Sequence, residues 1–278
     1  MVPARYGRYF EPFLGGGALF FDRLPETGVL SDVNAEIVGC YVAVRDQVEK
    51  LIRALKRHRY DVDHYYAVRD TDPESLAPVE RAARTIFLNK TGFNGLYRVN
   101  RSGKFNVPFG RYAKPVICDE DNLRACSAAL ARIELTVSDF EPSVDQAKPG
   151  DFVYLDPPYV PLSRTATFTA YAPGGFGPAA QQRLAHVFGR LAERRVHVLL
   201  SNSDVPEIRR LYGAYRVEIV KATRSINSKP SRRGPVSEVL VTSLSTAARR
   251  TSAPSSLTRR GPSGPPATSR SPRSTRSS

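Results

Sequence analysis

Tryptophan is absent from this 278-residue chain, and cysteine occurs only three times. Cys40, Cys118 and Cys126 form no C-x-x-C pair, so the chain lacks the pattern of a disulfide framework or a zinc site. The four histidines show no metal-ligand spacing, and we expect no bound metal. No apolar run is long enough to span a membrane, and no signal-peptide pattern is visible. We therefore expect a cytoplasmic protein with reduced thiols and no membrane partner.

Acidic residues are scarce relative to basic ones. Lys and Arg number 41 against 27 Asp and Glu, which gives a net charge of +14. No acidic residue follows Leu244, whereas seven arginines do, and removing these seven leaves +7 on residues 1–244. We expect the Ser-, Arg- and Pro-rich tail to be disordered. The remaining basic charge favours a polyanionic partner such as nucleic acid.

The most informative stretch is the apolar run 152–155 followed by Asp156-Pro157-Pro158-Tyr159. A short run of bulky apolar residues is typical of a strand buried on both faces of a parallel sheet. The two prolines cannot pair in a ladder, so the strand ends there. This places Asp156 and Tyr159 at the carboxyl end of a central strand, where open α/β sheets bind ligands.

The chemistry of this tetrapeptide suits an amino group that carries hydrogens. Asp156 can accept two hydrogen bonds, and a carbonyl fixed ahead of a proline can accept another. Tyr159 offers a flat face on which a nucleobase can stack. The alternative is a strand followed by an ordinary turn, because Asp-Pro is common turn chemistry.

A glycine-rich turn lies near the start of the chain. The segment 9–20 predicts a strand, a turn at Gly15-Gly16-Gly17 and the start of a helix, an arrangement that favours close approach of a ligand. It lacks the full G-x-G-x-x-G spacing, and a plain turn is the alternative. Asp32 ends the next predicted strand, where an acid can take the hydroxyls of a ribose. The alternative is that Asp32 or Asn34 caps the helix that follows at 35–56.

The segment 89–112 mixes asparagines, basic residues, aromatics and glycines and contains no acid. Its basic side chains can meet phosphates, and Asn and Arg can read purine edges. Asn-Gly and Ser-Gly pairs predict a hairpin-like loop. The alternative is a solvated basic surface loop.

The remaining segments predict alternating helices and strands. We expect helices over 79–88, 119–133 and 178–193, and strands over 28–32, 134–137, 196–201, 215–221 and 237–244. We expect Ser201-Asn202-Ser203-Asp204 to cap a short helix. Residues 160–177 predict a mobile loop near the site, and 224–234 form a basic, Ser-rich connection.

Four of these segments occur in one order: Glu11 to Gly17, Ser31 to Asn34, Phe93 to Gly110, and Asp156 to Tyr159. Together they resemble the Dam-type family of DNA adenine-N6 methyltransferases over about residues 5–244. The resemblance implies an α/β fold, with a seven-stranded Rossmann-like methyltransferase sheet and an inserted, mainly helical DNA-recognition domain that carries a hairpin loop. It divides the chain into a core in two parts (1–58 and 116–244), a target-recognition insertion (59–115) and a disordered basic tail (245–278).

The resemblance also implies roles for individual residues around S-adenosylmethionine and double-stranded DNA. The residues expected at the cofactor are Phe13, Gly15, Gly17, Asp32, Asp139, Phe140 and Asp156. The residues expected at the reacting base are Asp156, Pro157, Pro158 and Tyr159. The residues expected to meet DNA are Phe93, Asn94, Leu96, Arg98, Asn106 and Arg111.

The implied reaction moves a methyl group to N6 of an adenine that has left the helix, within a GATC-like site and by a monomer. Family members carry an amino-terminal Lys-Trp-x-Gly-Gly-Lys-like segment, for which this sequence shows no counterpart. Either the true start lies upstream, or the chain is a catalytically impaired DNA-binding remnant. Amino methylation of cytosine, RNA or a protein glutamine is a further alternative, and membership of a restriction-modification pair is left open.

Overall fold

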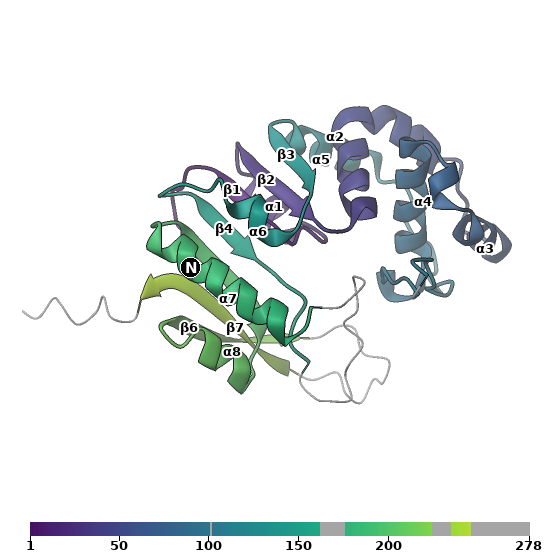
Figure 1. The fold of residues 1–278 in the computed structure, drawn as a ribbon. Coiled ribbons are helices and arrows are strands. Elements are labelled where there is room, and N and C mark those ends of the chain that lie inside the picture. The colour runs from purple at the N-terminus through teal and green to yellow at the C-terminus, as the bar shows by residue number, and fades with distance from the viewer. Residues whose placement is uncertain (101, 162–175, 224–234, 246–278) are drawn as a thin grey trace, which may run out of the picture. The chain divides into compact units, whose positions relative to one another are not determined.

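The computed structural model describes residues 1–100, 102–161, 176–223 and 235–245 (Figure 1). The predictions for the tail from residue 246 on, for most of the 160–177 loop and for the 224–234 connection therefore lie outside the described residues. The elements below belong to one compact unit, Met1–Thr246.

The centre of the fold is a seven-stranded sheet of order β3-β2-β1-β4-β5-β7-β6. The first five strands in this order are parallel, and β7 runs antiparallel to both of its neighbours. This confirms the predicted α/β class. The strands are β1 (Tyr9–Glu11), β2 (Gly28–Asp32), β3 (Ile133–Val137), β4 (Phe152–Leu155), β5 (His197–Ser203), β6 (Tyr215–Thr223) and β7 (Pro235–Ser245).

Helices connect the strands, and several begin with the residues that favour a helix start. The side chains of Asn34, Asp119 and Asp139 each accept a bond from a first-turn N–H, and Pro78 and Pro178 occupy first-turn positions. Within the described residues, no helix combines the length and the hydropathy that crossing a bilayer requires. The helices are α1 (Ala18–Arg23), α2 (Ala35–Leu55), α3 (Val62–Asp70), α4 (Pro78–Thr91), α5 (Glu120–Leu130), α6 (Phe140–Val144), α7 (Pro178–Glu193) and α8 (Pro206–Leu211), with short 3-10 turns η1 (Pro73–Ser75) and η2 (Phe93–Gly95).

One predicted cap is wrong. Ser201, Asn202 and Ser203 do not cap α8 but form the end of β5, where Asn202 and Ser203 pair with β7. The N-cap of α8 is Val205, which makes no side-chain cap bond. The strand continues because β7 offers a second ladder on its other side, and this pairing partner lies more than 30 positions later in the sequence.

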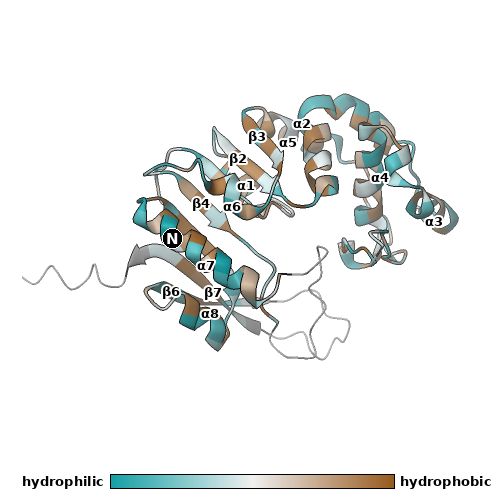
Figure 2. Ribbon diagram, in the orientation of Figure 1, coloured by the Kyte–Doolittle hydropathy of each residue, from teal (hydrophilic) through white to brown (hydrophobic). Residues whose placement is uncertain are grey.

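Buried apolar residues form one cluster on each face of the sheet. Figure 2 colours the ribbon by the hydropathy of each residue. Successive residues of β4 alternate between the faces: Phe152 belongs to the cluster that includes residues of α1, α2 and α4, whereas Val153 and Leu155 belong to the cluster that includes residues of α6 and α7. All three are at most 1% exposed. This confirms the prediction of a strand buried on both sides and leaves only its carboxyl end open to a ligand.

The chain reverses its direction of winding between β1 and β4. From β1 it passes to β2 on one side, and from β4 it passes to β5 on the other. Crossovers that leave in opposite directions open a crevice at the carboxyl ends of the two central strands. Glu11 ends β1 and Asp156 follows β4, so both side chains lie at this crevice.

A second, smaller apolar cluster lies around α3 and α4, which are separated from the sheet by α2 (Figure 1). Tyr65, Phe87 and Val107 are each fully buried within it. The chain after α4 turns back on itself through bridges between Gly92 and Phe109 and between Val99 and Phe105, which confirms the predicted hairpin-like loop. This cluster gives residues around the hairpin a support separate from the main sheet.

A close backbone contact between β1 and β2 generates the first prediction. A Cβ at Gly28 would lie 2.5 Å from the Tyr9 carbonyl oxygen in the neighbouring strand, so Gly28→Ala must push the strands apart. We expect a loss of about 1–3 kcal/mol in the free energy of unfolding, measured by thermal or urea denaturation.

Gly39→Ala is the matched control. Gly39 is an exposed residue of α2 with open space around its Cβ position, and Ala favours a helix by about 1 kcal/mol over Gly. The control should be neutral or stabilising. Equal stability of the Gly28→Ala and wild-type chains would contradict the strand pairing described here.

Candidate active site

Acidic side chains gather at the carboxyl edge of the parallel strands. Glu11 ends β1, Asp32 ends β2, Asp139 follows β3 and Asp156 follows β4. Backbone bonds tie the segments together, because the Leu14 N–H donates to the Ser31 carbonyl at 3.0 Å. The fold thus brings residues spread over more than 140 positions to one edge.

The glycine turn is built tightly against Asp32. Gly15 and Gly17 both have positive φ, at 44° and 62°, which an L side chain adopts only with strain. The Gly15 N–H donates to Asp32 Oδ2 at 3.1 Å, and the Tyr41 hydroxyl donates to the Gly15 carbonyl at 3.2 Å. A Cβ at Gly17 would lie 2.9 Å from that hydroxyl. The geometry therefore requires glycine at both positions and exposes the turn at Gly15.

Asp32 lies at the end of β2 beside the start of α2, and its role in binding a ribose stays a prediction. Its Oδ1 accepts the Asn34 N–H at 2.9 Å, which orders the chain at the start of α2, while Asn34 itself is the N-cap. Burial raises the pKa of Asp32, and the bonds from Asn34 and Gly15 oppose that rise. Each carboxylate oxygen has two acceptor positions, so the side chain retains capacity for hydroxyl groups.

Asp139 and Phe140 are covered by a residue that the sequence did not reveal. Arg183 of α7 donates to both oxygens of Asp139, at 2.7 and 2.6 Å. Its guanidinium lies 4.3 Å from the centre of the Phe140 ring, and Phe13 stacks on that ring at 5.4 Å. The Phe140 ring is only 2% exposed. A flat ligand at this point therefore meets Arg183 and Phe13 more readily than the Phe140 ring.

Asp156 occupies the wall of the crevice. Its side chain is accessible to solvent, but protein atoms surround its other sides, and this burial raises the pKa of the carboxyl. The Ser201 hydroxyl donates to Oδ1 at 2.6 Å. Hydrogen bonding from Ser201 and from Tyr159 opposes the rise in pKa. The carboxylate still has acceptor capacity for a substrate amine.

Two buried amides hold the backbone on either side of Tyr159. The Gln181 amide donates to the Pro158 carbonyl at 3.1 Å, and the Val160 N–H donates to Asn202 Oδ1 at 3.1 Å. Gln181 and Asn202 are 1% and 0% exposed, and they also bond to each other at 3.3 Å. Pro157 is buried and Tyr159 half-buried. Neither amide was expected at the site from the sequence, and Asn202 was expected in a helix cap. A polar residue within an otherwise apolar strand or helix face was the feature that could have indicated them.

Glu11 is a further acid that the sequence analysis did not assign to the site. It is 2% exposed, and the Tyr9 hydroxyl donates to its Oε2 at 2.7 Å. Burial raises the pKa of Glu11 to about 7, the Tyr9 bond opposes this, and the charge of Asp156 adds to it. Two carboxyl groups at one crevice disfavour double ionisation, so the more buried of them holds its proton longer.

The predicted DNA-contacting residues are divided between exposed and paired positions. Phe93 is 44% exposed, Asn94 adopts a positive φ of 54°, and Arg111 is exposed. Arg98 donates to the side chain of Asn106 at 2.7 Å and to its carbonyl at 3.0 Å. These two bonds use two of the five N–H donors of Arg98 and none of the side-chain amide donors of Asn106.

The base of the hairpin lies near the end of β2. Leu96 is half-buried against the second apolar cluster. Burial raises the pKa of the neighbouring Tyr97, and a hydrogen bond with Asn34 opposes that rise. Asn34 follows Asp32 by two positions. The hairpin is thereby connected to the end of β2.

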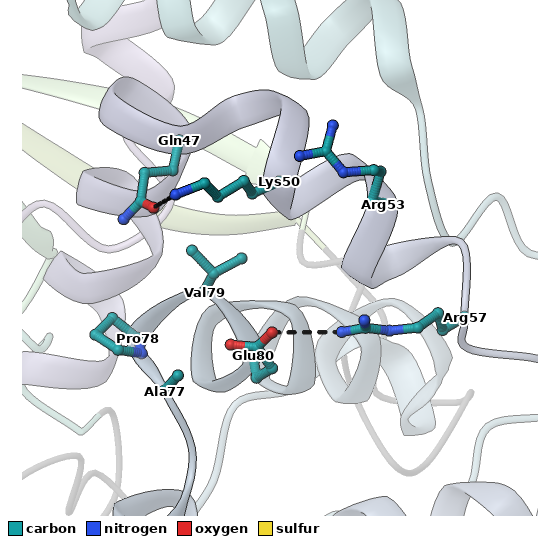
Figure 3. A pocket seen from close by; sticks show the side chains of 8 residues that line it. All are labelled: Gln47, Lys50, Arg53, Arg57, Ala77, Pro78, Val79 and Glu80. Atoms are coloured by element: carbon teal, nitrogen blue, oxygen red, sulfur yellow. Dashed lines mark hydrogen bonds and ion pairs between the residues drawn. The ribbon is translucent and has the colours of Figure 1, made fainter.

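A hollow of about 350 Å³ lies elsewhere, between the second half of α2 and the start of α4 (Figure 3). Its wall carries Lys50, Arg53 and Arg57, and Arg57 pairs with Glu80 at 3.5 Å. It offers no aromatic face and no turn of positive-φ glycines, so we place the chemistry at the sheet edge. Within the described residues, no three His, Cys, Asp or Glu side chains form a group that could hold a metal.

Comparisons with known proteins agree with this geometry. Residues 1–226 match the model of the D12 class N6 adenine-specific DNA methyltransferases. The chain is 41% identical over 250 residues to the type II methyltransferase M1.LlaDCHI of Lactococcus lactis subsp. cremoris, covering 87% of this chain and 88% of that one. It is 35% identical over 234 residues to the DNA adenine methylase of Escherichia coli K12, covering 83% and 84%.

The raised pKa of Glu11 generates a prediction about stability and pH. Its ordinary value is 4.5 and its folded value about 7, so the folded chain holds a proton that the unfolded chain releases between these values. Stability from this group is present below pH 4.5 and is lost as the pH rises to 7. We expect Glu11→Gln to gain about 2–3 kcal/mol over the wild type between pH 5 and pH 8.

Urea denaturation at several pH values measures this difference. Glu26→Gln, at an exposed position, is the control for the loss of one carboxylate from the chain. A difference between Glu11→Gln and the wild type that does not change with pH would contradict the raised pKa of Glu11.

Proposed function

The chain belongs to the D12 class of N6 adenine-specific DNA methyltransferases, and we propose that the carboxyl edge of its sheet uses S-adenosylmethionine as methyl donor. The observation that carries this proposal is the meeting of the glycine turn and Asp156 at the crevice between β1 and β4. The turn, together with Asp32 bonded to it, suits the methyl donor, and Asp156 suits the amine that receives the methyl group.

The residues at the edge fit the cofactor. The positive-φ turn at Gly15 and Gly17 leaves its outer side open for the amino-acid part, and the remaining acceptor capacity of Asp32 suits two ribose hydroxyls. Asp139, with Phe13 and the backbone N–H of Phe140 beside it, suits the adenine ring. S-adenosylmethionine supplies an electrophilic methyl group on sulfur.

Asp156 binds and orients the amine of the target base. Its carboxylate and the Pro157 carbonyl accept the two N6 hydrogens, which turns the nitrogen lone pair toward the methyl donor. When N6 takes the methyl group, the methyl–sulfur bond of the donor would break and positive charge would develop on N6. The fixed carboxylate would stabilise this charge until N6 releases a proton to water. Most of the rate enhancement then comes from positioning, because a displacement in line requires alignment of donor and acceptor.

Tyr159 receives the flipped adenine. Extrusion of the base from the duplex costs a few kcal/mol, and stacking on an aromatic ring returns about 1–3 kcal/mol. The bonds from Gln181 and Asn202 hold the backbone on both sides of Tyr159. The ring therefore needs little reordering when the base arrives.

Recognition of the target is assigned to residues 59–115, with 1–58 and 116–244 forming the catalytic core. The separate apolar cluster and the hairpin after α4 support this division. Arg98 and Asn106 supply donor and acceptor groups for base edges, and Phe93, Asn94, Leu96 and Arg111 lie on the same segment. The target sequence is proposed to be GATC, acted on by a monomer.

Transfer of tritiated methyl from S-adenosylmethionine to unmethylated duplex DNA tests the proposed function. We expect label on DNA that contains GATC and none on matched DNA without it. Label on both substrates would retain the chemistry and refute the target sequence. No label on either, despite measurable binding of the labelled cofactor, would contradict the proposed function.

Replacement of Asp156 by Ala tests the assigned role most simply. Loss of one preorganised charge-stabilising group costs about 100- to 1000-fold in turnover, and here the amine also loses its acceptor. We expect methyl transfer to fall at least this far while DNA affinity in a gel-shift assay is largely retained. Asp121→Ala, at a fully exposed carboxylate on α5, is the control and should keep the wild-type activity. Full activity of Asp156→Ala would contradict the role of Asp156 in the reaction.

A further inference from the structure

We propose that Ser201 of β5 is a positioning residue for methyl transfer, because its hydroxyl holds the Asp156 carboxylate in the orientation that receives the target amine. The inference rests on the role proposed above for Asp156. Ser201 does not touch the substrate in this account. It acts through the carboxylate.

The two strands place Ser201 opposite Asp156. Leu155 of β4 pairs with Leu200 of β5, so the next residues of the parallel strands, Asp156 and Ser201, continue side by side. The Ser201 hydroxyl lies 2.6 Å from Asp156 Oδ1, and Ser201 is 3% exposed. A short bond between a hydroxyl and a carboxylate is of the stronger, charge-assisted kind.

The direction of this bond follows from the hydrogens available. A serine hydroxyl has one hydrogen, and an ionised carboxylate can only accept, so Ser201 donates to Asp156. The Leu155 carbonyl is a poorer alternative at 3.4 Å. The Tyr154 hydroxyl lies 3.2 Å from Ser201 Oγ and completes the arrangement by donating to it. The chain of donors thus runs from Tyr154 through Ser201 to Asp156.

This bond does two things for the carboxylate. It fixes one oxygen, so that rotation about the side chain no longer spreads the other oxygen over several directions. It also favours the ionised form against burial, which raises the pKa of Asp156. Among the described residues, four charged or titratable groups face this region. They are Glu11 from β1, Tyr154 from β4, Tyr159 from the segment after β4, and Glu238 from β7.

Ser203 provides a matched comparison on the same strand. It lies two residues beyond Ser201, so its side chain points to the same face of the sheet, and it is 0% exposed. Its hydroxyl has no hydrogen-bond partner among the described residues. The two serines therefore share strand, face and burial but differ in contact with Asp156.

The test compares Ser201→Ala with Ser203→Ala in single-turnover methyl transfer to a duplex oligonucleotide at saturating S-adenosylmethionine. Loss of a hydrogen bond to a charged group predicts a rate about 10- to 100-fold lower for Ser201→Ala. Ser203→Ala should stay within about twofold of the wild type, because it removes no bond. The acidic limb of the pH–rate profile should move to higher pH in Ser201→Ala only.

A second pair of variants separates positioning from packing. Ser201→Thr and Ser201→Val have nearly the same shape and differ in the hydroxyl, so Thr should retain most of the rate that Val loses. In an Asp156→Asn background, Ser201→Ala should cause no further shift of the pH profile. Two results would overturn the inference: equal rates for the Thr and Val variants, or a pH–rate profile of Ser201→Ala that matches the profile of Ser203→Ala. Either result, obtained with an active wild type, would leave the proposed function intact. Absence of transfer by the wild type would overturn both.

Discussion

The parallel pairing of β1 with β4 is the constraint on which the rest of the structure depends. Crossovers leave these two strands in opposite directions, which opens a crevice at their carboxyl ends. The glycine turn after β1 and the Asp156 segment after β4 therefore face one crevice. Apolar residues of both strands lie in the clusters on the two faces of the sheet, and this burial between helices fixes the edge. A site that depends on positioning requires such a frame.

The frame places two carboxyl groups in buried surroundings that raise their pKa values, and hydroxyl donors oppose this rise. Glu11 and Asp156 end adjacent strands, and burial disfavours the ionised form of each. Tyr9 donates to Glu11 and Ser201 donates to Asp156, so each acid has its own donor. Glu11, which is almost fully buried, has its pKa raised to about 7 and is the acid that gives up its charge first. Asp156 faces solvent and can then serve as the charged acceptor.

Local patterns in the sequence predicted most of the fold and only part of the site. The strand before Asp156 and the helix at 178–193 were predictable because burial and helical periodicity are local properties. Arg183, Gln181, Ser201 and Asn202 were not, since each contacts its partner across more than 20 positions. Ser201 and Asn202 were assigned to a helix cap because Ser and Asn are common there; pairing with β7 extended the strand instead.

A crystal structure with S-adenosylhomocysteine, the demethylated product of the cofactor, tests the central claim most directly. The account predicts the product along the turn at Gly15 and Gly17, with its ribose at Asp32, its adenine beside Asp139 and its sulfur toward Asp156. That result would place donor and acceptor at the crevice between β1 and β4. Product bound in the basic hollow between α2 and α4, or away from Asp156, would contradict it.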